Sequence, residues 1–179
     1  PLFAGIVMVV VYALVTAYFP IVLFVEWFLP KYTASLNIFR IVLPGIAISS
    51  VITVVMHNFY KVAGKNKEYF AKSVIILILS IVANAVAYFL FRTMESISIA
   101  SIVTIVVWYM FVDQRLSKEC EKKSAKNLLY GVSMMLVFYS CSSISNVFIG
   151  VTCYVLAFVL ISILIYKDIL HIVKELIGK

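Results

Sequence analysis

One stretch decides what kind of structure this chain can adopt. Residues 38–60 are almost all apolar, and a short loop rich in lysine follows them at once. A helix needs about 20 apolar residues to cross the hydrocarbon core of a bilayer, and this run has about 23. Cationic loops stay in the cytoplasm during membrane insertion. We therefore predict a membrane-spanning helix whose C-terminal end is cytoplasmic.

Apolar residues dominate the rest of the chain as well. Of its 179 residues, 64% are hydrophobic and only 13% are charged, whereas about a quarter of the residues of a soluble domain are charged. A membrane β-barrel would show alternating segments of about ten residues, which this sequence lacks. We therefore predict an all-α integral membrane protein, because helices satisfy every backbone hydrogen bond within one segment.

The apolar runs predict a bundle of six transmembrane helices. They cover residues 2–29, 38–60, 73–91, 96–112, 128–144 and 147–166. We expect Pro20 to kink the first span, and Pro44–Gly45 to bend or unwind the second. Serines at the start of the fourth span would let a neighbouring helix approach closely. A cytoplasmic loop is expected at 114–127, and the apolar spacing of 167–179 predicts an amphipathic helix lying on the membrane.

The basic residues support this count of spans. With six spans, twelve of the 15 lysines and arginines fall on one side of the membrane and three on the other. Such asymmetry marks the cytoplasmic side, so both ends of the chain are predicted to be cytoplasmic. The net charge of +7 then reflects topology and attraction to anionic membrane lipids. It does not indicate a nucleic-acid interface, since no basic groove or stacking platform accompanies it.

Few polar side chains lie inside the spans, and these are the candidate functional residues. Arg40 lies just inside the second span, Asn84 lies within the third, and Arg92 ends the third. Their ordinary roles would be snorkelling to the interface for the arginines and interhelical hydrogen bonding for Asn84. The three cysteines have no metal-ligand spacing, and we predict no catalytic residue, no metal and no cofactor.

Several short motifs follow one another in an order similar to that of a known family. After the first span comes FLPKYTAS, after the second comes GKNKEYFAKS, and the third contains SIVANAVAYFLF. This order resembles the C-terminal half of bacterial polysaccharide flippases, the O-antigen and capsule exporters of the MATE-like superfamily. The resemblance covers residues 2–113 and departs at MESISIAS, where glycines are common in the family. The matching residues are Leu29, Pro30, Tyr32, Gly64, Lys65, Lys67 and Asn84.

The resemblance implies a transporter of the bacterial inner membrane. Residues 1–113 would be helices of the second lobe of a MATE-like transporter, and 128–166 an additional helix pair. The substrate would be an undecaprenyl-diphosphate-linked oligosaccharide, flipped from the cytoplasmic to the outer leaflet for surface polysaccharide synthesis. Arg40, Arg92 and Asn84 are the expected substrate-binding residues, with the arginines on the diphosphate. Because the chain begins at Pro1 within an apolar run, we expect an N-terminal half of the same chain as a partner.

Three other classes of function stay open at this stage. A cation-coupled exporter of the same superfamily would need an acidic residue deep in a span. A membrane enzyme acting on polyprenyl phosphates would need clustered acids or histidines, but Glu26, His57 and Glu95 are far apart in the sequence. A membrane scaffold without transport is the third alternative.

Overall fold

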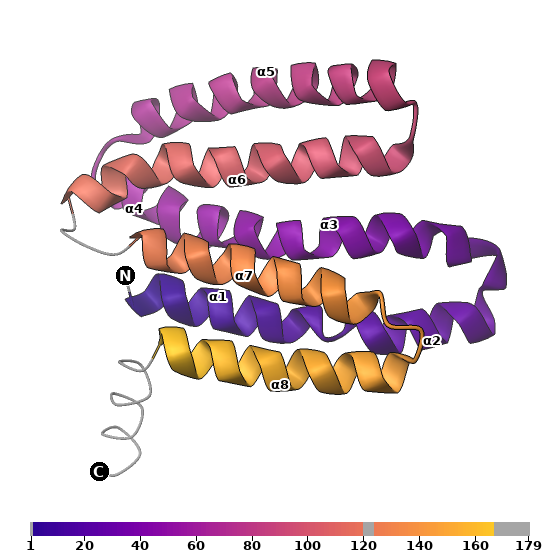
Figure 1. The fold of residues 1–179 in the computed structure, drawn as a ribbon. Coiled ribbons are helices and arrows are strands. Elements are labelled where there is room, and N and C mark those ends of the chain that lie inside the picture. Colours follow the sequence, from indigo (N-terminus) through magenta and orange to yellow (C-terminus); the bar gives the residue numbers. More distant parts are fainter. Residues whose placement is uncertain (1, 120–123, 167–179) are drawn as a thin grey trace, which may run out of the picture.

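The structure, a computed structural model, describes residues 2–119 and 124–166. All regular elements within these ranges are helices (Figure 1). They are α1 (Leu2–Val15), α2 (Tyr18–Phe28), a 3-10 turn η1 (Pro30–Tyr32), α3 (Thr33–Val51), a π-helical turn η2 (Ile52–Met56), α4 (His57–Val62), α5 (Asn66–Phe91), α6 (Met94–Glu119), α7 (Ser124–Ser142) and α8 (Val147–Ile165). The prediction of an all-helical structure is confirmed for the described residues.

The first predicted span is interrupted where its proline requires it. Pro20 has no N–H, so it cannot donate to the carbonyl group of Thr16, four residues earlier. The helix breaks into α1 and α2 at Thr16 and Ala17. The amide of Thr16 bonds to the carbonyl oxygen of Ala13, only three residues back. The predicted disturbance by Pro20 is therefore present, as a break one turn before the proline.

The expected unwinding at Pro44–Gly45 does not occur. Helix α3 continues through both residues, and the irregular geometry appears later, at η2. Gly45 has a packing role instead, because a Cβ atom there would lie 3.1 Å from Cγ1 of Ile102 on α6. The glycine thus allows α3 and α6 to pack closely.

The connections differ in part from those expected. Gly64 ends the α4 segment with φ +69°, a left-handed conformation that glycine adopts without strain. Helix α6 extends to Glu119 and α7 begins at Ser124, so helix covers much of the loop expected at 114–127. Cys120 and the predicted amphipathic helix at 167–179 lie outside the described residues.

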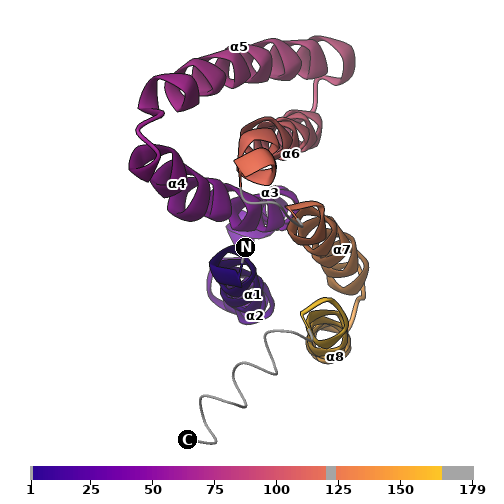
Figure 2. The same ribbon diagram turned by 90° about the vertical axis from the view of Figure 1, so that its left-hand side faces the viewer.

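Helix α3 lies at the centre of the bundle. It packs against α1, α6 and α7, and the view along the helices shows these three around it (Figure 2). Helix α5 packs mainly on α6, and α8 on α7, so both are peripheral. Of the side chains of α5, only that of Ile76 is buried.

Within the described residues, five helical segments are long and apolar enough to cross a membrane. They are Ala4–Phe28, Pro30–Val62, Asn66–Phe91, Met94–Asp113 and Val147–Ile165. Helix α7, which corresponds to the fifth predicted span, is not among them, so the count of six stays a prediction. The structure thus agrees with a multi-pass membrane protein.

The turns at the two ends of the bundle differ in their number of basic residues. The α4–α5 turn, the end of α6 and the start of α7 lie at the left in Figure 1. The α2–α3, α5–α6 and α7–α8 turns lie at the right. The left end carries Lys61, Lys65 and Lys67 in and around the α4–α5 turn, which we call the lysine-rich turn, whereas the turns that hold Lys31 and Arg92 lie at the right end. This placement is the one that the predicted topology requires.

Buried tyrosines join the helices through their hydroxyl groups. Tyr12 on α1 donates to the carbonyl oxygen of Gly131 on α7, at 2.7 Å. Tyr154 on α8 donates to the carbonyl oxygen of Tyr12, at 3.0 Å, beside the break in α1. Tyr60 on α4 donates to the carbonyl oxygen of Val112 on α6 and accepts from Lys72 on α5. These polar contacts link helices that have no hydrophobic drive to associate within lipid.

Candidate functional site

Arg40 lies inside the bundle at the end opposite the lysine-rich turn. It is seven residues after the start of α3, or about 10 Å along the helix axis, and its side chain is half-buried. It lines an open pocket of about 430 Å³ between α3, α6 and α7, which we call the Arg40 pocket. The pocket is lined by Arg40, Ile41, Ile99, Ile102, Val103, Met135, Tyr139 and Ser143.

The guanidinium group of Arg40 keeps most of its hydrogen-bonding capacity. Its Nη1 lies 3.5 Å from the carbonyl oxygen of Ser142, at the C-terminal end of α7, a long contact. A helix C-terminus carries partial negative charge, which favours a cation there. Among the described side chains, no carboxylate forms an ion pair with Arg40. Since arginine carries five N–H donors, the group retains donors for an anionic ligand.

The backbone beside Arg40 is held by a second helix. Pro44 cannot donate to the carbonyl group of Arg40, which weakens the helix at this turn. The hydroxyl group of Tyr139 on α7 donates to the neighbouring carbonyl of Ile41, at 2.8 Å. This bond links α7 to α3 next to the guanidinium group, and the two helices form two walls of the pocket.

The other two predicted site residues lie elsewhere in the structure. The amide oxygen of Asn84 on α5 accepts a hydrogen bond of 3.1 Å from Ser101 on α6. This is the interhelical bonding role considered for Asn84 above. Arg92 is exposed just after α5, in a left-handed conformation with φ 51°. Neither residue lines the Arg40 pocket, although Arg92 lies in a turn at the same end of the bundle.

The remaining titratable groups form no catalytic cluster in the part of the chain that the structure describes. Glu26 and Glu95 are exposed, and His57 stacks on Tyr69 with 5.1 Å between the ring centroids. Cys141 and Cys153 are free thiols. No group of three His, Cys, Asp or Glu side chains within the described residues is placed to hold a metal ion.

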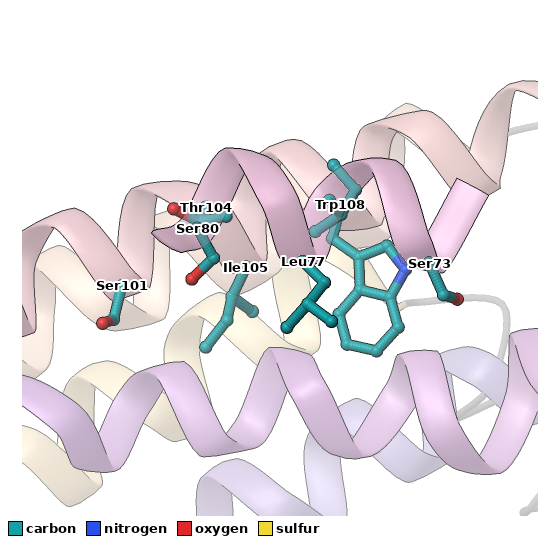
Figure 3. Close-up of a pocket in the computed structure, with 8 residues that line it drawn as sticks. Ser73, Leu77, Ser80, Ser101, Thr104, Ile105 and Trp108 are labelled. Carbon is teal, nitrogen blue, oxygen red and sulfur yellow. The ribbon is translucent and has the colours of Figure 1, made fainter. Parts of the chain in front are cut away.

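Sequence reasoning missed two pockets lined by hydroxyl groups. One has a volume of about 400 Å³ and lies between α5 and α6, where Ser73, Ser80 and Thr104 line it together with Trp108 (Figure 3). The other, of about 340 Å³, lies between α3 and α6. The serines of α6 had been interpreted only as small packing residues. The spacing of these serines on one helix face is the sequence feature that could have predicted the pockets.

Comparisons with known proteins identify no family. No protein-family model matches the chain, and neither a curated protein nor a solved structure matches it.

Proposed function

We propose that this chain takes part in moving a lipid-linked oligosaccharide across the bacterial inner membrane. In this proposal its helices form one lobe of a MATE-like transporter with an additional helix pair, α7 and α8. The lipid diphosphate is the group that Arg40 recognises. The motif order of residues 2–113 and the sorting of charge between the two ends of the bundle support this function.

The Arg40 pocket is the observation that carries the proposal. A charge within a membrane-spanning segment is costly, and such charges mark pathways for ions or polar substrates. Arg40 lies in the second candidate span and lines an open pocket without an ion pair to a described carboxylate. Arginine binds phosphate oxygens through two parallel N–H···O bonds. A diphosphate therefore complements the free donors of Arg40 in both charge and geometry.

In the proposed function, the Arg40 pocket serves alternating access. In that mechanism two packed bundles rock against each other around a substrate site. The α3–α7 contact beside Arg40 is fixed by the Tyr139–Ile41 hydrogen bond, so these helices would move as one unit. Movement would then occur at other packing surfaces, and the guanidinium group would keep its position relative to α7.

Replacement of Arg40 tests the proposed role in export. We expect Arg40→Ala to abolish most surface polysaccharide when the chain is part of an active transporter, because the diphosphate loses its cationic partner. Arg40→Lys keeps the charge but loses the planar fork, so partial export should remain. Surface polysaccharide is measured against the amount of the protein in the membrane, determined by immunoblot.

A neighbouring cation provides the matched control. Lys31 lies at the same end of the bundle but is exposed in η1, so Lys31→Ala should leave export unchanged. Arg92→Ala in the same assay decides whether the second predicted arginine belongs to the site. Normal export by Arg40→Ala, at equal membrane levels, would show that Arg40 does not hold the substrate.

A further inference from the structure

The two pockets form one groove along α6, with a line of hydroxyl groups among aliphatic side chains. They share Ser101 and Ile105 as lining residues, so they adjoin at these side chains. On α6 the polar lining residues are Ser98, Ser101, Thr104 and Trp108, which recur every three or four residues and so lie on one helix face. We call this feature the hydroxyl groove. From Ser98 to Trp108 it extends about 15 Å along the axis, about half of a bilayer's hydrocarbon thickness.

The other walls of the groove also carry hydroxyl groups. Ser49, Ser50 and Thr53 line it from α3 and η2, and Ser73 and Ser80 line it from α5. No charged side chain lines either pocket. The groove thus differs from the Arg40 pocket, which lies on the α7 side of the contact between α3 and α6. The side chain of Ile102 lines both and separates them.

Most hydroxyl groups of the groove offer acceptors and no free donor. Thr104 donates to the carbonyl oxygen of Ala100, at 2.7 Å, and Ser50 to that of Ile46, at 2.8 Å. Ser73, Thr53 and Ser98 make equivalent bonds within their own helices. Ser101 donates to Asn84. The hydrogens of these six hydroxyl groups are therefore engaged, while lone pairs on their oxygens stay available.

One side chain supplies the complementary donor. The indole Nε1 of Trp108 is buried and has no hydrogen-bond partner among the described residues. Figure 3 shows this nitrogen at the end of the pocket where Ser73 lies. An unpaired buried N–H costs free energy, so a water molecule or ligand that accepts from it would stabilise the structure. Among the described residues, the groove therefore combines several acceptors with one unsatisfied donor.

We infer that the hydroxyl groove binds the neutral sugar hydroxyls of a saccharide. A sugar hydroxyl donates to an oxygen lone pair and accepts from an N–H, so it matches both kinds of group in the groove. An anion would find no cation, and a metal ion would find no carboxylate, among the side chains that line it. This inference rests on the proposed function for the source of the saccharide. It assigns the sugar to the groove and the diphosphate to the Arg40 pocket.

Tryptophan fluorescence tests the inference directly. The chain has two tryptophans, Trp27 and Trp108, so Trp27→Phe leaves Trp108 as the sole reporter of the groove. The purified chain in phosphatidylcholine nanodiscs is titrated with neutral trisaccharides of glucose, mannose and N-acetylglucosamine. We expect at least one of them to change Trp108 emission saturably. Removal of three hydroxyls in S98A/S101A/T104V should weaken this response by about ten-fold or more, as expected for several lost hydrogen bonds.

Controls separate binding in the groove from other effects. Ser140 is an exposed serine on α7 whose hydroxyl bonds within its own helix, so Ser140→Ala should bind saccharide normally. Trp108→Phe leaves only Trp27, which is 84% exposed near the end of α2, and its emission should not respond. Circular dichroism verifies that the triple variant keeps its helix content.

Other results of the fluorescence experiment would overturn the inference of saccharide binding. They would not affect the proposed function, which the export assay tests separately. If acyl chains fill the groove, brominated phosphatidylcholine will quench Trp108 and no trisaccharide will relieve the quenching. A lack of response to all three trisaccharides, or an equal response in the folded triple variant, also refutes saccharide binding. Arg40→Ala in the Trp27→Phe background should keep the response. Loss of export with retained saccharide binding therefore separates the two sites.

Discussion

A single hydroxyl group on α1 shows how individual residues stabilise this bundle. The Tyr12 hydroxyl bonds to Gly131 of α7, and the Tyr12 carbonyl accepts from Tyr154 of α8, so one residue connects three helices. We expect Tyr12→Phe to lower the free energy of unfolding by about 0.6 kcal/mol, and by no more than about 1.7 kcal/mol, the range for hydrogen bonds between membrane helices. Denaturation in mixed micelles, followed by circular dichroism, measures this loss. Tyr88→Phe is the control, because Tyr88 is exposed on α5, and an equal loss there would contradict the argument.

At the scale of elements, the α7–α8 hairpin depends on a close backbone contact. A Cβ atom on Gly150 of α8 would lie 2.9 Å from the carbonyl oxygen of Cys141 on α7 and 3.1 Å from Cε1 of Phe19. A backbone oxygen cannot rotate away, so Gly150→Ala should push the helices apart and destabilise the protein by about 1–3 kcal/mol. The same denaturation assay applies. Gly131→Ala is the matched control, since its Cβ would meet nothing closer than 3.5 Å; comparable stability of both variants would disprove the role of Gly150.

The elements also show what could be predicted from the sequence. The apolar runs and their basic connections predicted helices at the right places, because both signals come from local composition. The break before Pro20 follows from one missing N–H and was expected as a kink, whereas the π-helical turn at Ile52–Met56 has no local breaker residue. The Arg40 pocket required α6 and α7 to meet α3, and the hydroxyl groove required serines of α3, α5 and α6 to face one another. Such contacts depend on helix rotation, which a nearly uniform apolar sequence does not specify.

At the scale of the whole molecule, the position of α7 decides between five and six spans. If α7 crosses the membrane, the α7–α8 turn lies outside together with the α2–α3 turn, as the two ends of the bundle in Figure 1 indicate. We therefore expect Ser145→Cys and Lys31→Cys, in a background without Cys120, Cys141 and Cys153, to react with an impermeant maleimide added to intact cells. Lys67→Cys, at the start of α5, should react only after the membrane is permeabilised. If α7 does not cross, α8 begins on the cytoplasmic side, and Ser145→Cys will behave like Lys67→Cys while Lys31→Cys still reacts from outside. That pattern would establish five spans and remove α7 from the membrane, and with it the wall that Tyr139 and Met135 give to the Arg40 pocket.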